Sequence, residues 1–157
     1  MPRILVFGNS GSGKTTLARR LSDELGVARL DLDLLAWDAP GRRRPLVQSA
    51  ADIRAFAGRH TDWVIEGSYG DLVEVVVPLC SKMRFLNPGV EACVANCRAR
   101  PWEPEKYPTP EAQAERLDFL ISWVREYDSR SDEYSLARHR EIFDAFAGPK
   151  AEIRGPA

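Results

Sequence analysis

The sequence predicts an α/β fold in three layers, with about five parallel strands and helices on both faces of the sheet. Two observations support this prediction. Short apolar segments rich in β-branched residues alternate with longer segments of helical periodicity, which is typical of parallel sheets with helical crossovers. A glycine-rich segment, residues 8–15, stands between the first apolar segment and the first helical one. Ligands of such sheets bind at the carboxyl ends of the strands, so we expect a binding site beside this segment.

The elements are expected in a regular order along the chain. Strands are expected at residues 3–7, 27–32, 63–66, 83–86 and 151–154. Helices are expected at residues 14–25, 47–60, 90–100, 111–126 and 134–146, the last one capped within 131–133. Residues 71–79 are ambiguous, because Asp71 can cap a helix while the valine run 75–77 favours a strand. Residues 38–46 and 101–110 contain several prolines and are expected to be loops.

Length and composition fit a single globular domain spanning residues 1–157. The chain is 44% hydrophobic and 29% charged, with a net charge of -1. A net charge this close to zero argues against a broad basic surface for nucleic acid or an anionic membrane. The N-terminal apolar run, residues 4–7, is too short for a signal peptide or a membrane span. With three cysteines in addition, we expect a protein of the reducing cytoplasmic compartment.

Residues 8–15 read Gly-Asn-Ser-Gly-Ser-Gly-Lys-Thr and match the phosphate-binding loop, or P-loop, pattern G-x-x-x-x-G-K-[ST]. Its glycines let successive backbone N–H groups point at one phosphate, and the following helix directs the positive end of its dipole there. We expect Lys14 to act in catalysis by bridging the β- and γ-phosphates of ATP, and Thr15 to ligate Mg²⁺. The residues expected to bind ATP are Gly8, Ser10, Gly11, Ser12, Gly13, Lys14, Thr15 and Thr16.

Other features narrow the class of P-loop protein. The chain is shorter than the core of a helicase or a transporter ATPase, and it lacks the Asn-Lys-x-Asp motif that reads guanine. The remaining short class is that of small-molecule and nucleotide kinases, which move the γ-phosphoryl group of ATP to a small acceptor. Two alternatives stay open: an ATP-dependent regulatory or nucleic-acid-associated switch, and a protein that hydrolyses ATP slowly without an acceptor.

Three stretches outside the P-loop carry a resemblance to a known family. They are Leu-Asp-Leu-Leu-Ala-Trp at 32–37, Trp-Val-Ile-Glu-Gly-Ser-Tyr at 63–69 and Phe-Leu-Asn-Pro at 85–88. Together with the P-loop they resemble the DNA topology modulation protein group of the adenylate kinase- and shikimate kinase-like P-loop proteins. The resemblance implies this fold and ATP chemistry more than a particular substrate. The group usually has an aspartate at the positions of Glu66 and Asn87.

The acceptor side of the expected site is marked by carboxylates at strand ends. Asp31 and Asp33 lie two residues apart and therefore on one side of an extended chain. The resemblance implies that such a pair serves Mg²⁺ and the acceptor hydroxyl, and a carboxylate there can take a proton; the alternative is a helix cap or an exposed pair. Glu66 is a second candidate metal residue, or else a surface carboxylate. Tyr69 either lines the acceptor pocket or packs as a half-buried ring.

The resemblance also implies an acceptor-binding segment at about 37–60 and a lid at about 98–112. Arg98 and Arg100 precede the proline-rich part of this lid, where arginines of such kinases clamp the transferring phosphoryl group. The alternative is that both only interact with a helix dipole. The arginine run 42–44 attracts an anionic acceptor or is simply solvated. Residues 148–150 contact the adenine or merely end a helix.

Overall fold

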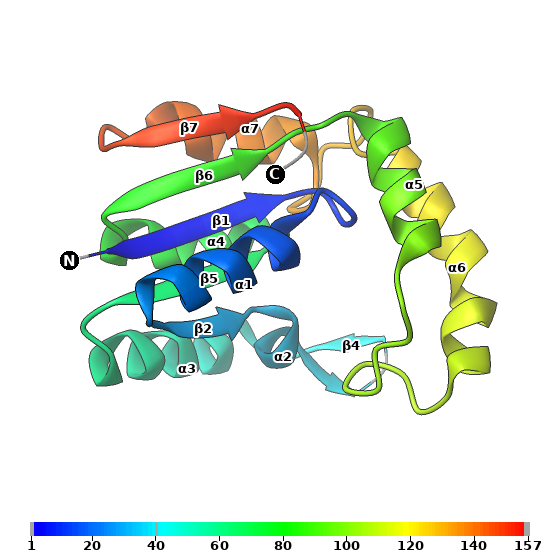
Figure 1. Ribbon diagram of the computed structural model, residues 1–157, viewed down its shortest axis with the longest axis horizontal. Coiled ribbons are helices and arrows are strands. Elements are labelled where there is room, and N and C mark those ends of the chain that lie inside the picture. Colours follow the sequence, from blue (N-terminus) through cyan, green and yellow to red (C-terminus); the bar gives the residue numbers. More distant parts are fainter. Residues whose placement is uncertain (1, 40, 156–157) are drawn as a thin grey trace.

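A computed structural model, which describes residues 2–39 and 41–155, confirms the α/β fold and its five-stranded parallel sheet (Figure 1). The strands are β1 (Arg3–Gly8), β2 (Ala28–Asp31), β5 (Trp63–Gly67), β6 (Lys82–Leu86) and β7 (Lys150–Ile153). Their order across the sheet is β2-β5-β1-β6-β7, and every neighbouring pair is parallel. The first strand in sequence therefore lies in the middle of the sheet.

Helices cover both faces of this sheet. They are α1 (Lys14–Leu25), α2 (Asp33–Ala36), α3 (Leu46–Arg59), α4 (Gly70–Val76), a 3₁₀ helix (Val77–Leu79), α5 (Val90–Ala99), α6 (Pro110–Arg125) and α7 (Leu136–Ala145). Because successive side chains of a strand point to opposite faces, Ile4 and Val6 of β1 pack against α1, whereas Leu5 and Phe7 face the helices on the other side. A strand buried on both faces must be apolar throughout, as β1 is.

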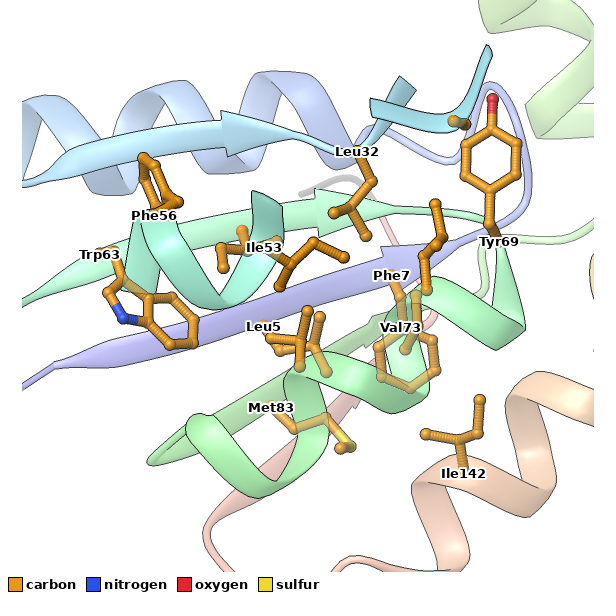
Figure 2. Close-up of a cluster of buried hydrophobic side chains, with 14 of the residues drawn as sticks. Leu5, Phe7, Leu32, Ile53, Phe56, Trp63, Tyr69, Val73, Met83 and Ile142 are labelled. Atoms are coloured by element: carbon orange, nitrogen blue, oxygen red, sulfur yellow. The ribbon is translucent and has the colours of Figure 1, made fainter. Parts of the chain in front are cut away.

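The larger apolar cluster lies between the sheet and helices α3, α4 and α7 (Figure 2). Figure 2 shows Leu5, Phe7 and Met83 pointing from the strands into this cluster, with Ile53 and Val73 facing them from the helices. Helices α5 and α6 pack against each other in a separate cluster beyond the carboxyl ends of the strands (Figure 1). No helix within residues 2–39 or 41–155 is both long and apolar enough to cross a membrane.

One ambiguity is resolved and two local predictions need correction. Residues 71–79, left open between helix and strand, are helical, because Val73 and Val76 are buried in the larger cluster and need helical spacing to reach it. The cap of α7 is Ser135, whose side chain accepts a hydrogen bond from the Arg138 N–H, and not a residue of 131–133. The predicted loop 38–46 instead holds most of an antiparallel hairpin of β3 (Trp37–Ala39) and β4 (Arg42–Arg43); Pro40 lies outside the described residues.

The pairing register fixes which residues share the binding edge of the sheet. Gly8 at the end of β1 pairs with Leu86 at the end of β6, and Asp31 of β2 pairs with Glu66 of β5. Lys150, by contrast, pairs with Met83 near the start of β6. Residues 148–150 therefore lie at the opposite end of the sheet from the P-loop, and the expectation that they contact adenine is wrong.

A buried histidine ties α7 to the segment that follows β5. His139 is fully buried, and its Nε2 lies 2.8 Å from the Ser68 carbonyl oxygen while its Nδ1 lies 2.7 Å from the Tyr127 hydroxyl. Since a carbonyl only accepts, Nε2–H donates to it and Nδ1 accepts from Tyr127. Burial lowers the pKa of His139 from 6.5 to about 4, so the ring is held neutral.

Stability should fall as the pH drops because of this ring. Between pH 6.5 and about pH 4 the unfolded chain binds a proton at His139 that the folded chain does not. Integrated over that window, the loss of unfolding free energy is about 3 kcal/mol. Urea unfolding at several pH values should show a shallower pH dependence for His139→Gln than for the wild type. His60→Gln, at a half-buried position against the Phe56 ring, is the control, and a wild-type slope in His139→Gln would contradict the assignment.

Candidate functional site: a phosphate-binding cleft

A wide cleft opens at the carboxyl edge of the sheet, between the strand ends and helices α5 and α6. Its walls come from three parts of the chain: the P-loop, the ends of β2 and β5 with the β3–β4 hairpin, and the segment between α5 and α6 with the cleft-facing side of α6. The P-loop contributes Ser10, Gly11, Ser12, Gly13, Lys14, Thr15 and Thr16. Gly8 lies just below, at the end of β1.

Glycine is required at two positions of the P-loop. Gly11 and Gly13 have φ angles of 80° and 97°, which side chains rarely tolerate. A Cβ atom on Gly11 would also lie 2.3 Å from the Cys93 carbonyl oxygen of α5. On the same helix, the Asn96 side-chain amide donates a 2.8 Å hydrogen bond to the Gly11 carbonyl. The loop is therefore held open in one conformation by α5.

Lys14 lies inside the P-loop, where its Nζ donates a 2.8 Å hydrogen bond to the Asn9 carbonyl. Burial lowers the pKa of Lys14, and the negative charges of Glu66 and Asp33 oppose this shift. The first N–H groups of α1 have no partner within the helix. The hydroxyl oxygen of Ser12 is buried with no hydrogen-bond partner among the described residues. Together these unpaired donors and the ammonium fit the phosphates of a nucleotide.

Thr15 and Glu66 meet beside the loop. The Thr15 hydroxyl donates a 2.5 Å hydrogen bond to Glu66 Oε1, and Arg29 Nη1 lies 3.4 Å from Oε2. Glu66 is 1% exposed; burial and the nearby Asp31 raise its pKa, while the bond from Thr15 acts in the other direction. A hydroxyl and a carboxylate here are hard oxygen donors of the kind that Mg²⁺ prefers.

Asp33 lies at the centre of a second polar group, at the start of α2. The Tyr69 hydroxyl donates to Asp33 Oδ1, and the Trp37 indole N–H donates to the Tyr69 oxygen at 3.0 Å. Lys106 Nζ lies 2.7 Å from Asp33 Oδ2 and 3.4 Å from Asp31 Oδ2. Burial acts to raise the pKa of Asp33, but Lys106 and the Tyr69 hydrogen bond prevail and lower it. The pKa of Asp31 is raised, by burial and by the charge of Asp33.

Sequence reasoning missed Lys106. It lies in the segment between α5 and α6, and its Nζ is also 3.3 Å from Glu103 Oε2. Although burial acts to lower the pKa of Lys106, the charges of Asp33 and Asp31 raise it. The available signal was weak: Lys106 is the single lysine of the proline-rich stretch 101–110. Nothing in that stretch indicates which strand end it will reach.

The two predicted lid arginines differ in position. Arg100 lines the cleft, lies 3.6 Å from Glu103, and its charge contributes to the lowered pKa of Lys14. Arg98 is exposed on α5 and is not among the residues lining the cleft. The structure therefore places Arg100 in the cleft near Lys14 of the P-loop, whereas Arg98 lies outside the cleft.

The arginine run 42–44 is engaged in ion pairs within the chain. Arg42 lies 3.4 Å from Asp38, Arg43 lies 3.0 Å from Asp71, and Arg44 lies 2.7 Å from Asp52. None of these three arginines lines the cleft. The expectation that the run attracts an anionic acceptor gains no support from these contacts.

Gly11→Ala should damage the P-loop. A side chain at this φ costs about 1–2 kcal/mol, and the collision with the Cys93 carbonyl adds to that cost. We expect a lower unfolding free energy in urea and at least tenfold weaker binding of an ATP analogue. Gly58→Ala is the matched control, since its new Cβ meets open space within α3 and should raise stability by about 0.5–1 kcal/mol. Equal behaviour of the two variants would contradict the assigned constraint.

No protein-family model and no curated protein sequence matches the chain, but solved structures do. A shikimate kinase from Bacteroides thetaiotaomicron is 21% identical, with 80% of this chain and 78% of that chain covered and a TM-score of 0.52. A gluconokinase from Sinorhizobium meliloti is 15% identical and has a TM-score of 0.52; the match covers 99% of this chain and 84% of the gluconokinase chain. A sugar kinase from Janibacter is 18% identical and has a TM-score of 0.50; the match covers 99% of this chain and 87% of the sugar kinase chain. The chain therefore has the fold seen in shikimate kinase and gluconokinase.

Proposed function

We propose that the protein is an ATP-dependent phosphotransferase that moves the γ-phosphoryl group of ATP to a hydroxyl of a small acceptor. The observation that carries this proposal is that the P-loop with Lys14 and the carboxylate of Asp33 face one cleft. Their charges lie near enough for Asp33 to act on the pKa of Lys14. The likeness in fold to known kinases supports the same function.

The cleft divides into a phosphate side and an acceptor side. The triphosphate lies on the P-loop, where Lys14 exchanges the Asn9 carbonyl for the β- and γ-phosphates. The acceptor lies over the ends of β2 and β5, with its hydroxyl near Asp33. That oxygen forms a bond to the γ-phosphorus, the bond to the β,γ-bridging oxygen breaks, and ADP leaves. The acceptor proton passes to Asp33 and then to water.

The Mg²⁺ of this reaction fits beside Thr15 and Glu66. The Thr15 hydroxyl and the Glu66 carboxylate, which meet at 2.5 Å, are the residues that would hold the ion. Bound there, Mg²⁺ would neutralise charge on the phosphates. Asp33 was a further candidate ligand, and its bonds to Tyr69 and Lys106 favour a role toward the acceptor instead. Within residues 2–39 and 41–155, no three His, Cys, Asp or Glu side chains form a metal cluster.

We assign the segment around 98–112 as a lid within a single domain. Its two cleft-facing cations have different partners: Arg100 lies by Lys14, and Lys106 bridges Asp31 and Asp33. With substrates bound, Arg100 clamps the transferring phosphoryl group and the lid excludes water. The proposed acceptor-binding segment, 37–60, contributes Trp37 and the hairpin to the opposite wall.

Phosphoryl transfer from labelled ATP with Mg²⁺ to a panel of small alcohols tests this function. We expect labelled product that disappears in Lys14→Ala and falls by about 10²–10⁴-fold in Asp33→Asn, which loses the proton acceptor. Asp52→Asn is the control, because Asp52 pairs with Arg44 and does not line the cleft. Slow, Lys14-dependent phosphate release without any acceptor product would instead favour an ATP-dependent switch of the DNA topology modulation type.

A further inference from the structure

Four aromatic rings form a continuous wall on the acceptor side of the cleft. Trp37, Tyr69, Tyr134 and Trp123 all line the cleft. Their rings meet edge to face, with centroids 6.3 Å apart for Trp37 and Tyr69, 5.3 Å for Tyr69 and Tyr134, and 5.1 Å for Tyr134 and Trp123. Figure 2 shows Tyr69 at the edge of the buried cluster with its hydroxyl pointing out of it. Tyr69 is 6% exposed, so the apolar area that this wall offers to a ligand comes mainly from Trp37, which is 40% exposed, and from the half-buried rings of Tyr134 and Trp123.

Arg43 holds this aromatic wall in place from outside the cleft. Its guanidinium lies 4.9 Å from the Tyr69 ring centroid, 5.8 Å from that of Trp37 and 6.0 Å from that of Tyr134. It also donates to Asp71 at 3.0 Å and to the Tyr134 hydroxyl at 2.6 Å. Because these partners use its charge and its donors, Arg43 is not available to bind an anionic group of the acceptor.

The charges that face the acceptor side are mainly negative. Lys106 is the cation that reaches Asp31 and Asp33, and it is already shared among those two carboxylates and Glu103. The carboxylates that line this side and the lid are Asp31, Asp33, Asp38, Glu103 and Glu105. Asp38 pairs with Arg42 and Arg44, and Glu103 pairs with Arg100, so the negative charge on this side comes mainly from Asp31, Asp33 and Glu105. An anionic acceptor placed here would meet these like charges beside a lysine that is already engaged, which costs free energy.

The cleft is also lined by the cations Lys14, Arg19, Arg100, Arg116 and Arg154, of which Arg19 is on α1 and Arg154 pairs with Glu152. Arg100 lies close enough to Lys14 to act on its pKa. Arg116 lines a small pocket together with Arg100 between α5 and α6, and its guanidinium lies 5.3 Å from the Phe119 ring. Along α6, Arg116 is two turns from Trp123, or about 10 Å along the helix axis. Because Arg116 lines the cleft and lies on the same helix as Trp123, its contribution to acceptor binding is tested directly below.

From these charges and this wall we infer that the acceptor is an alcohol without an anionic group, either uncharged or amine-bearing, with an apolar face that contacts the aromatic wall. This inference rests on the proposed phosphotransferase function and names its substrate class. Lys106 supports the amine-bearing case, since its own ammonium already occupies the site between Asp31 and Asp33. Shikimate and gluconate themselves are carboxylates and fall outside this class.

Matched pairs of acceptors that differ in charge test the inference by binding alone. The wild-type protein, saturated with a non-hydrolysable ATP analogue and Mg²⁺, is titrated by calorimetry with three pairs of compounds. They are shikimate and its methyl ester, uridine monophosphate and uridine, and gluconate and the open-chain amine glucamine. We expect the uncharged or amine-bearing member to bind at least tenfold more tightly in at least one pair, and no anionic member to be preferred. The inference would be overturned if no uncharged or amine-bearing compound bound, or if the anionic compounds bound more tightly.

Variants of cleft residues then show whether the acceptor binds at the aromatic wall. Trp37→Ala should weaken binding at least tenfold, whereas Val47→Ala, at an 81% exposed position away from the cleft, should not. Arg116→Ala should leave the preference unchanged, and loss of anion binding in this variant would identify Arg116 as an acceptor clamp and contradict the inference.

Transfer from ATP then separates this inference from the proposed function. If the uncharged members bind but accept no phosphoryl group, the phosphotransferase proposal fails and the ligand class stands. If Lys14-dependent transfer goes to the anionic members, the phosphotransferase proposal stands and the acceptor class is wrong.

Discussion

The parallel pairing of β1 with β5 on one side and β6 on the other is the constraint on which the rest of the site depends. It brings the carboxyl ends of these strands to one edge, with Gly8 opposite Leu86 and Phe7 opposite Gly67. The P-loop, the carboxylate of Glu66, and the aspartates at the end of β2 and the start of α2 therefore lie at the same edge. A sheet with antiparallel neighbours would have sent half of these groups to the opposite edge.

Charge of alternating sign runs across the cleft. Lys14 is near enough to Glu66 and Asp33 for both carboxylates to act on its pKa, and Lys106 Nζ lies 2.7 Å from Asp33. A buried charge without a partner costs several kcal/mol. In the ligand-free protein, each charged group therefore interacts with a neighbouring group of the chain. In the proposed reaction, phosphate, Mg²⁺ and the acceptor would replace these internal partners.

The sequence alone predicted the features that depend on short-range pattern. Alternating strand and helix periodicity defined the parallel sheet, and the motif at 8–15 placed the P-loop at the end of β1. What it could not predict depends on contacts between distant segments. Lys106 reaches Asp33 across 73 positions of the chain because a proline-rich segment folds back over the sheet edge, and Tyr69 reaches Asp33 through the turn after β5. Neither segment has a periodicity from which its path could be predicted.

The most direct test of this account is a structure with a non-hydrolysable ATP analogue and Mg²⁺. We expect the triphosphate on residues 8–15, with Lys14 Nζ moved from the Asn9 carbonyl to the phosphates and Thr15 moved from Glu66 to the metal ion. The aromatic wall and Asp33 should remain open to the acceptor. A nucleotide bound elsewhere, with Lys14 still on Asn9 and Thr15 still on Glu66, would contradict the account.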